Sequence, residues 1–132
     1  MKNNSLDIKN LTAITALFVH AAKIDEIYTD KEKKIIVAFL KLFTEDAELI
    51  SDIMQKAELI EDNSNQLLSY TNILKKSSLK SKSIVIEQLW KIILSDNKSD
   101  DYENNLMRRI CGLIYFPDKL SGEIKKKLII IN

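Results

Sequence analysis

Residues that make tight turns are almost missing from this sequence. Its 132 residues include only 2 glycines and 1 proline, where average usage would give roughly 16 such residues. A chain this poor in turn-making residues cannot supply the many tight turns of a β-sandwich or a β-barrel. Gly112 and Gly122 also fit neither G-x-G-x-x-G nor G-x-x-x-x-G-K-[ST], so the glycine-rich loops of nucleotide-binding enzymes are excluded.

Cysteine and histidine are equally scarce. Cys111 is the single cysteine and His20 the single histidine, which excludes an intrachain disulfide, a cysteine-rich zinc site and motifs with paired histidines. A catalytic Cys–His pair would need contact between residues on two different predicted helices, and Cys111 falls at an apolar position typical of a small buried residue. With no nucleophile–base pair and no cofactor loop, we expect no catalytic activity.

Long apolar runs and an excess of one charge are missing as well. The longest purely apolar stretch, residues 35–40, has 6 residues, against the ~18 that a membrane span requires, and no apolar run follows Met1 as it would in a signal peptide. The net charge of +1 gives no general attraction to nucleic acid or to a membrane. With only 2 arginines and no aromatics interleaved with the lysines, specific nucleic-acid binding is not expected. We expect a cytoplasmic protein.

Apolar residues recur at steps of three and four along nearly the whole chain, which is the spacing of amphipathic helices. Seven sets with this spacing follow one another, the first being Leu11, Ile14, Phe18 and Ala21. Residues 83–95 are apolar on nearly every side, which predicts a helix at the centre of a bundle. We predict one all-α domain over residues 1–132, a compact bundle of about seven helices, with the first five and last three residues flexible.

Local signals predict where helices begin and end. Thr29–Glu32 and Asp100–Glu103 have the spacing of capping boxes, in which each side chain binds the other residue's backbone N–H. Thr44 precedes two acids that favour the positive end of a helix, so Thr44 is predicted to cap the next helix. Pro117 is predicted to stop a helix that ends near Tyr115.

A shift of 71 residues superimposes two helix–loop–helix units of the chain. The acidic turns match, and so do the apolar positions beside them: Asp25 with Asp96, Thr29 with Asp100, Glu32 with Glu103, Phe18 with Leu89, and Phe39 with Ile110. We infer two related helical hairpins, packed as a pseudo-symmetric pair and covered by residues 44–80.

This pattern, an apolar helix ending in Asp, a short turn and an acid seven residues later, resembles the TerB-like family of tellurite resistance proteins. The second unit is most similar, with Leu89-Trp90, Asp96, Asp100, Tyr102, Glu103, Leu106 and Arg108-Arg109-Ile110. The resemblance spans about residues 11–128 and implies a bundle of about seven helices. It also implies a role in tellurite or other stress resistance, and binding of a divalent cation.

The two acidic turns are the candidate metal sites, because carboxylates and turn carbonyls are the hard oxygens that Ca²⁺ or Mg²⁺ prefers. The candidate ligands are Asp25, Glu32, Asp96, Glu103 and His20. An EF-hand is excluded, since Ile27 and Lys98 stand where its loop needs an acid or amide. The first turn is the favoured site, because Lys91 occupies the second unit's counterpart of His20.

The same acids have a purely structural interpretation that requires no cofactor. Glu32 and Glu103 occupy the third position of capping boxes, where an acid stabilises a helix by roughly 0.5–2 kcal/mol. Asp25 and Asp96 can close their turns by accepting backbone N–H groups. Relatives usually carry Gly after each Asp, whereas this chain has Glu26 after the first one. This departure from the family pattern favours the structural interpretation.

Charge is unevenly distributed along the chain. Residues 44–62 hold 7 acids and one lysine, residues 75–82 hold 4 lysines and no acid, and three consecutive lysines begin at Lys125. Solvated helix faces or docking surfaces would both explain this pattern. Two functions stay open: a non-enzymatic TerB-like stress-response module that binds a divalent cation, and a metal-free helical scaffold that binds another protein or itself through residues 44–62 or the C-terminus. A weak peripheral membrane contact of Lys125–Asn132 also stays open.

Overall fold

The computed structural model describes residues 8–23, 28–63, 67–96 and 101–131. These residues form seven α-helices and one short 3₁₀ helix, and no strand occurs among them. The helices are α1 (Ile8–Ala22), α2 (Asp30–Leu40), α3 (Ala47–Asn63), α4 (Leu67–Lys75), α5 (Leu79–Ile93), α6 (Asp101–Ile114) and α7 (Asp118–Ile131), with the 3₁₀ helix η1 at Leu94–Asp96. The predicted all-α bundle of about seven helices is confirmed.

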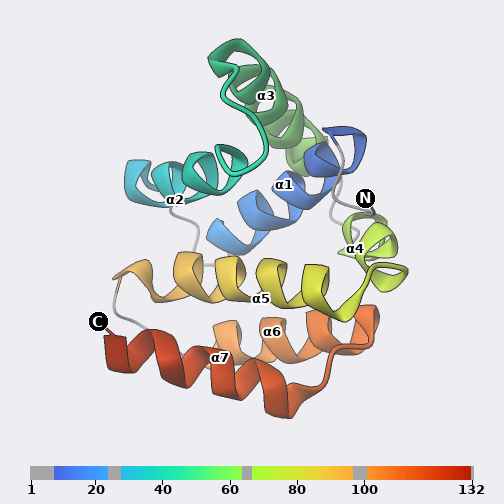
Figure 1. The fold of residues 1–132 in the computed structure, drawn as a ribbon, viewed down its shortest axis with the longest axis vertical. Coiled ribbons are helices and arrows are strands. Elements are labelled where there is room, and N and C mark those ends of the chain that lie inside the picture. The colour runs from blue at the N-terminus through green and yellow to red at the C-terminus, as the bar shows by residue number, and fades with distance from the viewer. Residues whose placement is uncertain (1–7, 24–27, 64–66, 97–100, 132) are drawn as a thin grey trace.

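Two helices occupy the centre of the bundle (Figure 1). α1 contacts α2, α3, α4 and α5, whereas α5 contacts α1, α2, α6 and α7. α6 and α7 lie on one side of α5, and α1, α2 and α3 lie on the other. Val85, Ile86 and Leu89 of α5 are 0% exposed, which confirms a central helix in this region, although the helix spans Leu79–Ile93 and not residues 83–95.

The apolar stripes of the helices meet in one core. Phe18 of α1 packs edge to face on Phe39 of α2, with ring centroids 4.9 Å apart and an interplanar angle of 87°, a favoured geometry for aromatic pairs. Burying each such side chain stabilises the fold by about 1.5–3 kcal/mol. The largest fully buried side chains are Phe18, Phe39, Leu11, Ile14, Leu17, Ile36, Leu40, Leu74, Ile86, Leu89 and Ile92.

The start of α3 differs from the sequence prediction. Asp46, and not Thr44, caps this helix: its Oδ1 accepts the N–H of Glu48 at 3.0 Å and that of Leu49 at 3.2 Å. Thr44 Oγ1 instead accepts the N–H of Asp46 at 3.1 Å, before the helix begins. The prediction was wrong because both residue types can cap a helix, and the backbone selects the one next to Ala47.

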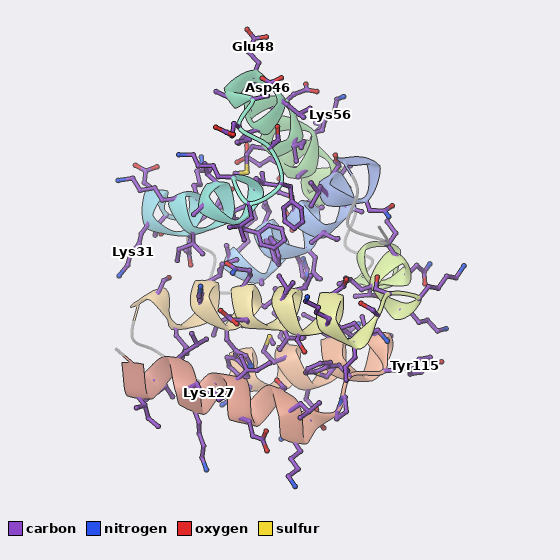
Figure 2. All side chains as sticks on the ribbon, in the orientation of Figure 1. Lys31, Asp46, Glu48, Lys56, Tyr115 and Lys127 are labelled. Carbon is purple, nitrogen blue, oxygen red and sulfur yellow. The ribbon has the colours of Figure 1, made fainter. Side chains whose placement is uncertain are left out.

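The end of α6 lies where Pro117 predicts it. Tyr115 has a φ of 61°, and the N–H of Phe116 donates to the carbonyl of Cys111 at 2.8 Å. This is the Schellman arrangement, in which a left-handed residue ends the helix and satisfies a terminal carbonyl. Figure 2 shows the Tyr115 side chain pointing away from the bundle.

Several predictions fall outside the described residues. They include the first five residues, the turn residues Asp25 and Asp100, and the side chains of Asp96 and Glu103. The pseudo-symmetric relation of the two hairpins therefore stays a prediction. Within the described ranges, no helix combines the length and the apolarity that crossing a bilayer requires.

Candidate functional site

A buried carboxylate joins the end of α1 to the end of α3. Glu61 is only 7% exposed, and its Oε2 lies 3.3 Å from Nδ1 of His20. Its Oε1 lies 2.9 Å from Nζ of Lys23, which also contacts Oδ1 of Asp62 at 2.8 Å. Hydrogen bonds to Asp62 and then to Glu61 raise the pKa of Lys23 above its ordinary value, so this ammonium stays charged.

A second carboxylate on α3 holds the segment just before α2. The hydroxyl of Tyr28 donates to Oε2 of Glu58 at 2.9 Å. Lys33 lies above the Tyr28 ring, 4.9 Å from its centroid, and its Nζ is 3.9 Å from the same Glu58 oxygen. Burial, then the hydrogen bond to Glu58 and the charges of Glu58, Glu32 and Glu61, raise the pKa of Tyr28 far above its ordinary value. The phenol therefore stays protonated and acts as a donor.

We call the buried Glu61 and the half-buried His20, Lys23, Tyr28 and Glu58, taken together, the buried junction. Sequence analysis did not single out its two glutamates and assigned residues 44–62 to one acidic surface. Yet Glu61 lies four residues after Ala57 on the apolar stripe of α3, and this position was a signal that its side chain turns inward. The acids at the other end of α3 do face solvent, as Figure 2 shows for Asp46 and Glu48.

Glu32, a predicted metal ligand, is engaged in the capping box of α2. Its Oε1 accepts the N–H of Thr29 at 2.8 Å and the Thr29 hydroxyl at 3.2 Å. In return, Thr29 Oγ1 accepts the N–H of Glu32 at 3.2 Å. The capping box that the sequence predicts here is confirmed, and it accounts for the 5% exposure of the Glu32 side chain.

The described donors do not assemble a metal site. His20 is bound to Glu61 and Glu32 to Thr29, and in the part of the chain with defined positions no group of three or more His, Cys, Asp or Glu side chains could hold an ion. The other predicted ligands, Asp25, Asp96 and Glu103, have side chains outside that part. A metal site would thus need donors beyond those that the described residues bring together.

An apolar groove lies beside the buried junction, between α2 and α3. Its volume is about 370 Å³. Its lining includes Lys33 and Val37 from α2, Lys41 at the C-cap of this helix, and Ile50, Ser51 and Met54 from α3. Glu58 lines it as well, so the contact between Lys33 and Glu58 lies at one end. We call this feature the α2–α3 groove.

The comparisons with known proteins give one finding. A family model described as "Tellurite resistance protein TerB" matches residues 11–126. No curated protein and no solved structure matches the chain. The matched range contains every residue of the buried junction and of the α2–α3 groove.

Proposed function

Because the chain belongs to the TerB family of tellurite resistance proteins, we propose that it is a non-enzymatic helical module that binds a protein partner, as part of tellurite resistance or another stress response in the cytoplasm. The observation that carries the proposal is the α2–α3 groove. Val37, Ile50 and Met54 give this groove an apolar floor along two helices, and an apolar groove between helices is the usual receptor for the apolar face of an amphipathic helix.

The groove has dimensions that suit a short helix. Lys33 of α2 and Lys41, the C-cap residue of this helix, are eight residues apart and line the same wall, a separation of about 12 Å along the helix axis. Two to three turns of a partner helix would cover this length, with apolar residues at helical spacing as anchors. Leu42 and Phe43, which follow Lys41, are 70% and 36% exposed and add apolar surface at the end of α2.

Charge complementarity selects an acidic partner helix. The α2 wall of the groove carries Lys33 and Lys41. A hollow of about 390 Å³ on the adjoining surface is lined by these two lysines, Lys34 and Val37, with Asp30 as its one acid among the described residues. Carboxylates flanking the apolar stripe of a partner helix would pair with these ammonium groups as the apolar residues enter the groove. The partner that we propose is therefore an amphipathic helix with Asp and Glu along one edge.

A library of displayed helical peptides of about 16 residues, selected on the folded protein, tests this proposal. We expect the binders to carry an apolar stripe flanked by Asp and Glu. Ser51→Trp fills the groove from an exposed position, and Lys41→Glu reverses the charge of its wall. Each change should weaken the selected peptides at least about tenfold in fluorescence anisotropy titrations.

Matched controls separate the groove from the rest of α3. Gln55→Trp and Lys56→Glu make the same chemical changes at exposed positions that do not line the groove, and they should leave affinity unchanged. The proposal fails if no peptide is selected, or if the binders ignore Ser51→Trp and Lys41→Glu.

Metal binding at the first acidic turn is the second candidate function. The observation that favours it is the pair of carboxylates bound to the segment that follows Asp25 in the chain, where Glu58 accepts from the Tyr28 hydroxyl and Glu32 from the Thr29 N–H. Isothermal titration with Ca²⁺ and Mg²⁺ tests it, with Asp25→Asn as the variant and Asp96→Asn as the probe of the second turn. An isotherm that survives in both variants, or no isotherm with either ion, would contradict this candidate.

A further inference from the structure

A polar pocket lies on the opposite side of the bundle from the α2–α3 groove. It has a volume of about 530 Å³ and is lined by residues of α5, α6 and α7. This size falls within the roughly 300–1,000 Å³ of pockets that hold small molecules. We call it the α6–α7 pocket.

The floor of the pocket is a fixed indole. Trp90 of α5 is 4% exposed, and its Nε1 donates to Oγ of Ser121 on α7 at 3.0 Å. Above this ring lies the ammonium group of Lys125, 4.8 Å from the ring centroid. Lys125 also donates to Oδ1 of Asn104 on α6 at 3.0 Å. The Lys125 ammonium is thus fixed over the indole ring by its contacts with α5 and α6.

Positive charge dominates the walls. Among the residues whose side chains the structure describes, Arg108 and Lys125 line the pocket, against the single carboxylate of Asp118. The side-chain amides of Asn104 and Asn105 on α6 also line the pocket, and an amide N–H group can donate a hydrogen bond to an oxygen atom of a ligand. A guanidinium and an ammonium group facing one small cavity recognise a carboxylate or a phosphate group. We propose that the α6–α7 pocket binds a small organic anion that carries such a group.

A glycine keeps one wall of this pocket open. Gly122 lies inside α7 and lines the pocket, although glycine in a helix costs roughly 0.5–1 kcal/mol relative to alanine. Its φ is not positive, so the backbone does not require glycine. A Cβ at this position would meet no atom within 4 Å, and a larger side chain would therefore extend into the cavity without a clash at its base.

The single tryptophan of the chain lies in the pocket and reports on it directly. We would titrate the protein with inorganic phosphate, adenosine monophosphate and citrate while recording Trp90 fluorescence and the NMR signal of its indole N–H. Sodium chloride at equal ionic strength is the reference. We expect saturable changes with at least one anion. Saturation with citrate alone identifies a carboxylate site, and saturation with either phosphate probe identifies a phosphate site.

Two pairs of variants locate the binding. Gly122→Leu fills the pocket, and Gly112→Leu makes the same change on α6, at a site outside the pocket that also has open space around its Cβ. Arg108→Gln removes a wall cation, and the exposed neighbour Arg109→Gln is its control. Affinity should fall at least about tenfold in Gly122→Leu and Arg108→Gln only. Changes that do not saturate, that sodium chloride reproduces, or that persist in both pocket variants would overturn the proposal.

Discussion

Glu61 and His20, 41 residues apart in the chain, meet at 3.3 Å between a carboxylate oxygen and Nδ1. The contact fixes how α3 lies on α1, because Lys23, which directly follows α1, binds the other oxygen of the same carboxylate at 2.9 Å. It also bears on metal binding: with Nδ1 held by Glu61, an ion at His20 would have to bind through Nε2. The residue that the sequence offers as a ligand is thus part of the packing between two helices.

Removing the Glu61 carboxylate should weaken the whole domain. We expect Glu61→Ala to lower the free energy of unfolding by about 1–3 kcal/mol, because Lys23 and His20 lose their shared buried partner. Asp62→Ala is the control, since its side chain is 64% exposed, and it should cost about 0–1 kcal/mol. Urea unfolding followed by circular dichroism measures both values. Equal losses in the two variants would show that Glu61 has no special structural role.

The cap of α3 gives a prediction that distinguishes two neighbouring residues. Asp46→Ala should lower the free energy of unfolding by about 1 kcal/mol, because the N–H groups of Glu48 and Leu49 lose their acceptor. Thr44→Ala removes a single contact outside the helix and should cost less than half as much. Thermal unfolding of both variants, under one set of conditions, is the measurement. A larger loss in Thr44→Ala would restore the sequence prediction.

The sequence was sufficient wherever the determining contacts are local. The spacing of Leu11, Ile14 and Phe18 depends only on the helical period, and it correctly predicts a buried face. The capping box of Thr29 and Glu32 is equally local, because both partners lie within one turn. Where two capable residues stand close together, as at the start of α3, the backbone geometry decides between them.

Contacts between distant residues could not be predicted in the same way. The pairing of Tyr28 with Glu58 and of Trp90 with Ser121 depends on how the helices pack, and no local pattern determines that packing. The α2–α3 groove and the α6–α7 pocket could not be predicted either, because both are formed by the packing of helices. Glu61 is an intermediate case, since its position on the apolar stripe of α3 shows burial but not its partner.

Stability should fall at alkaline pH through Cys111. Burial raises the pKa of this thiol from its ordinary 9.0 to about 11. Below pH 9 the thiol keeps its proton in both the folded and the unfolded chain, so its full contribution to the free energy of unfolding is present. Between pH 9 and 11 the unfolded chain loses the proton while the folded chain keeps it, so the free energy of unfolding decreases as pH rises.

Urea unfolding across this window measures the effect. The loss should be on the order of 2 kcal/mol, and it should be absent in Cys111→Ala. Tyr28 and Lys23 also have raised pKa values, but they affect the wild type and Cys111→Ala equally. The difference between the two plots of unfolding free energy against pH therefore reports on the thiol alone. Parallel curves for the wild type and Cys111→Ala would contradict the prediction.

The left-handed conformation of Tyr115 predicts a stabilising substitution. Tyr115→Gly should raise the free energy of unfolding by about 0.5–1 kcal/mol, because glycine adopts a positive φ without the steric cost of a Cβ. The gain is reduced by the loss of the contact with Lys75, whose Nζ lies 5.1 Å from the ring centroid. Tyr115→Ala, which removes the same ring but keeps the Cβ, should show no gain in differential scanning calorimetry. A gain in both variants would assign the effect to the ring.

One buried hydroxyl gives the last prediction. Thr15 of α1 is 0% exposed, and its Oγ1 finds no hydrogen-bond partner among the described residues. Burying an unpaired hydroxyl costs about 1–3 kcal/mol, so Thr15→Val, which has nearly the same shape, should raise the free energy of unfolding by about 1 kcal/mol. Thr71 is 1% exposed but does have an interaction partner, so Thr71→Val should lower the free energy of unfolding instead. Urea unfolding of the two variants compares them directly, and a Thr15→Val protein no more stable than the wild type would show that the hydroxyl is satisfied in solution.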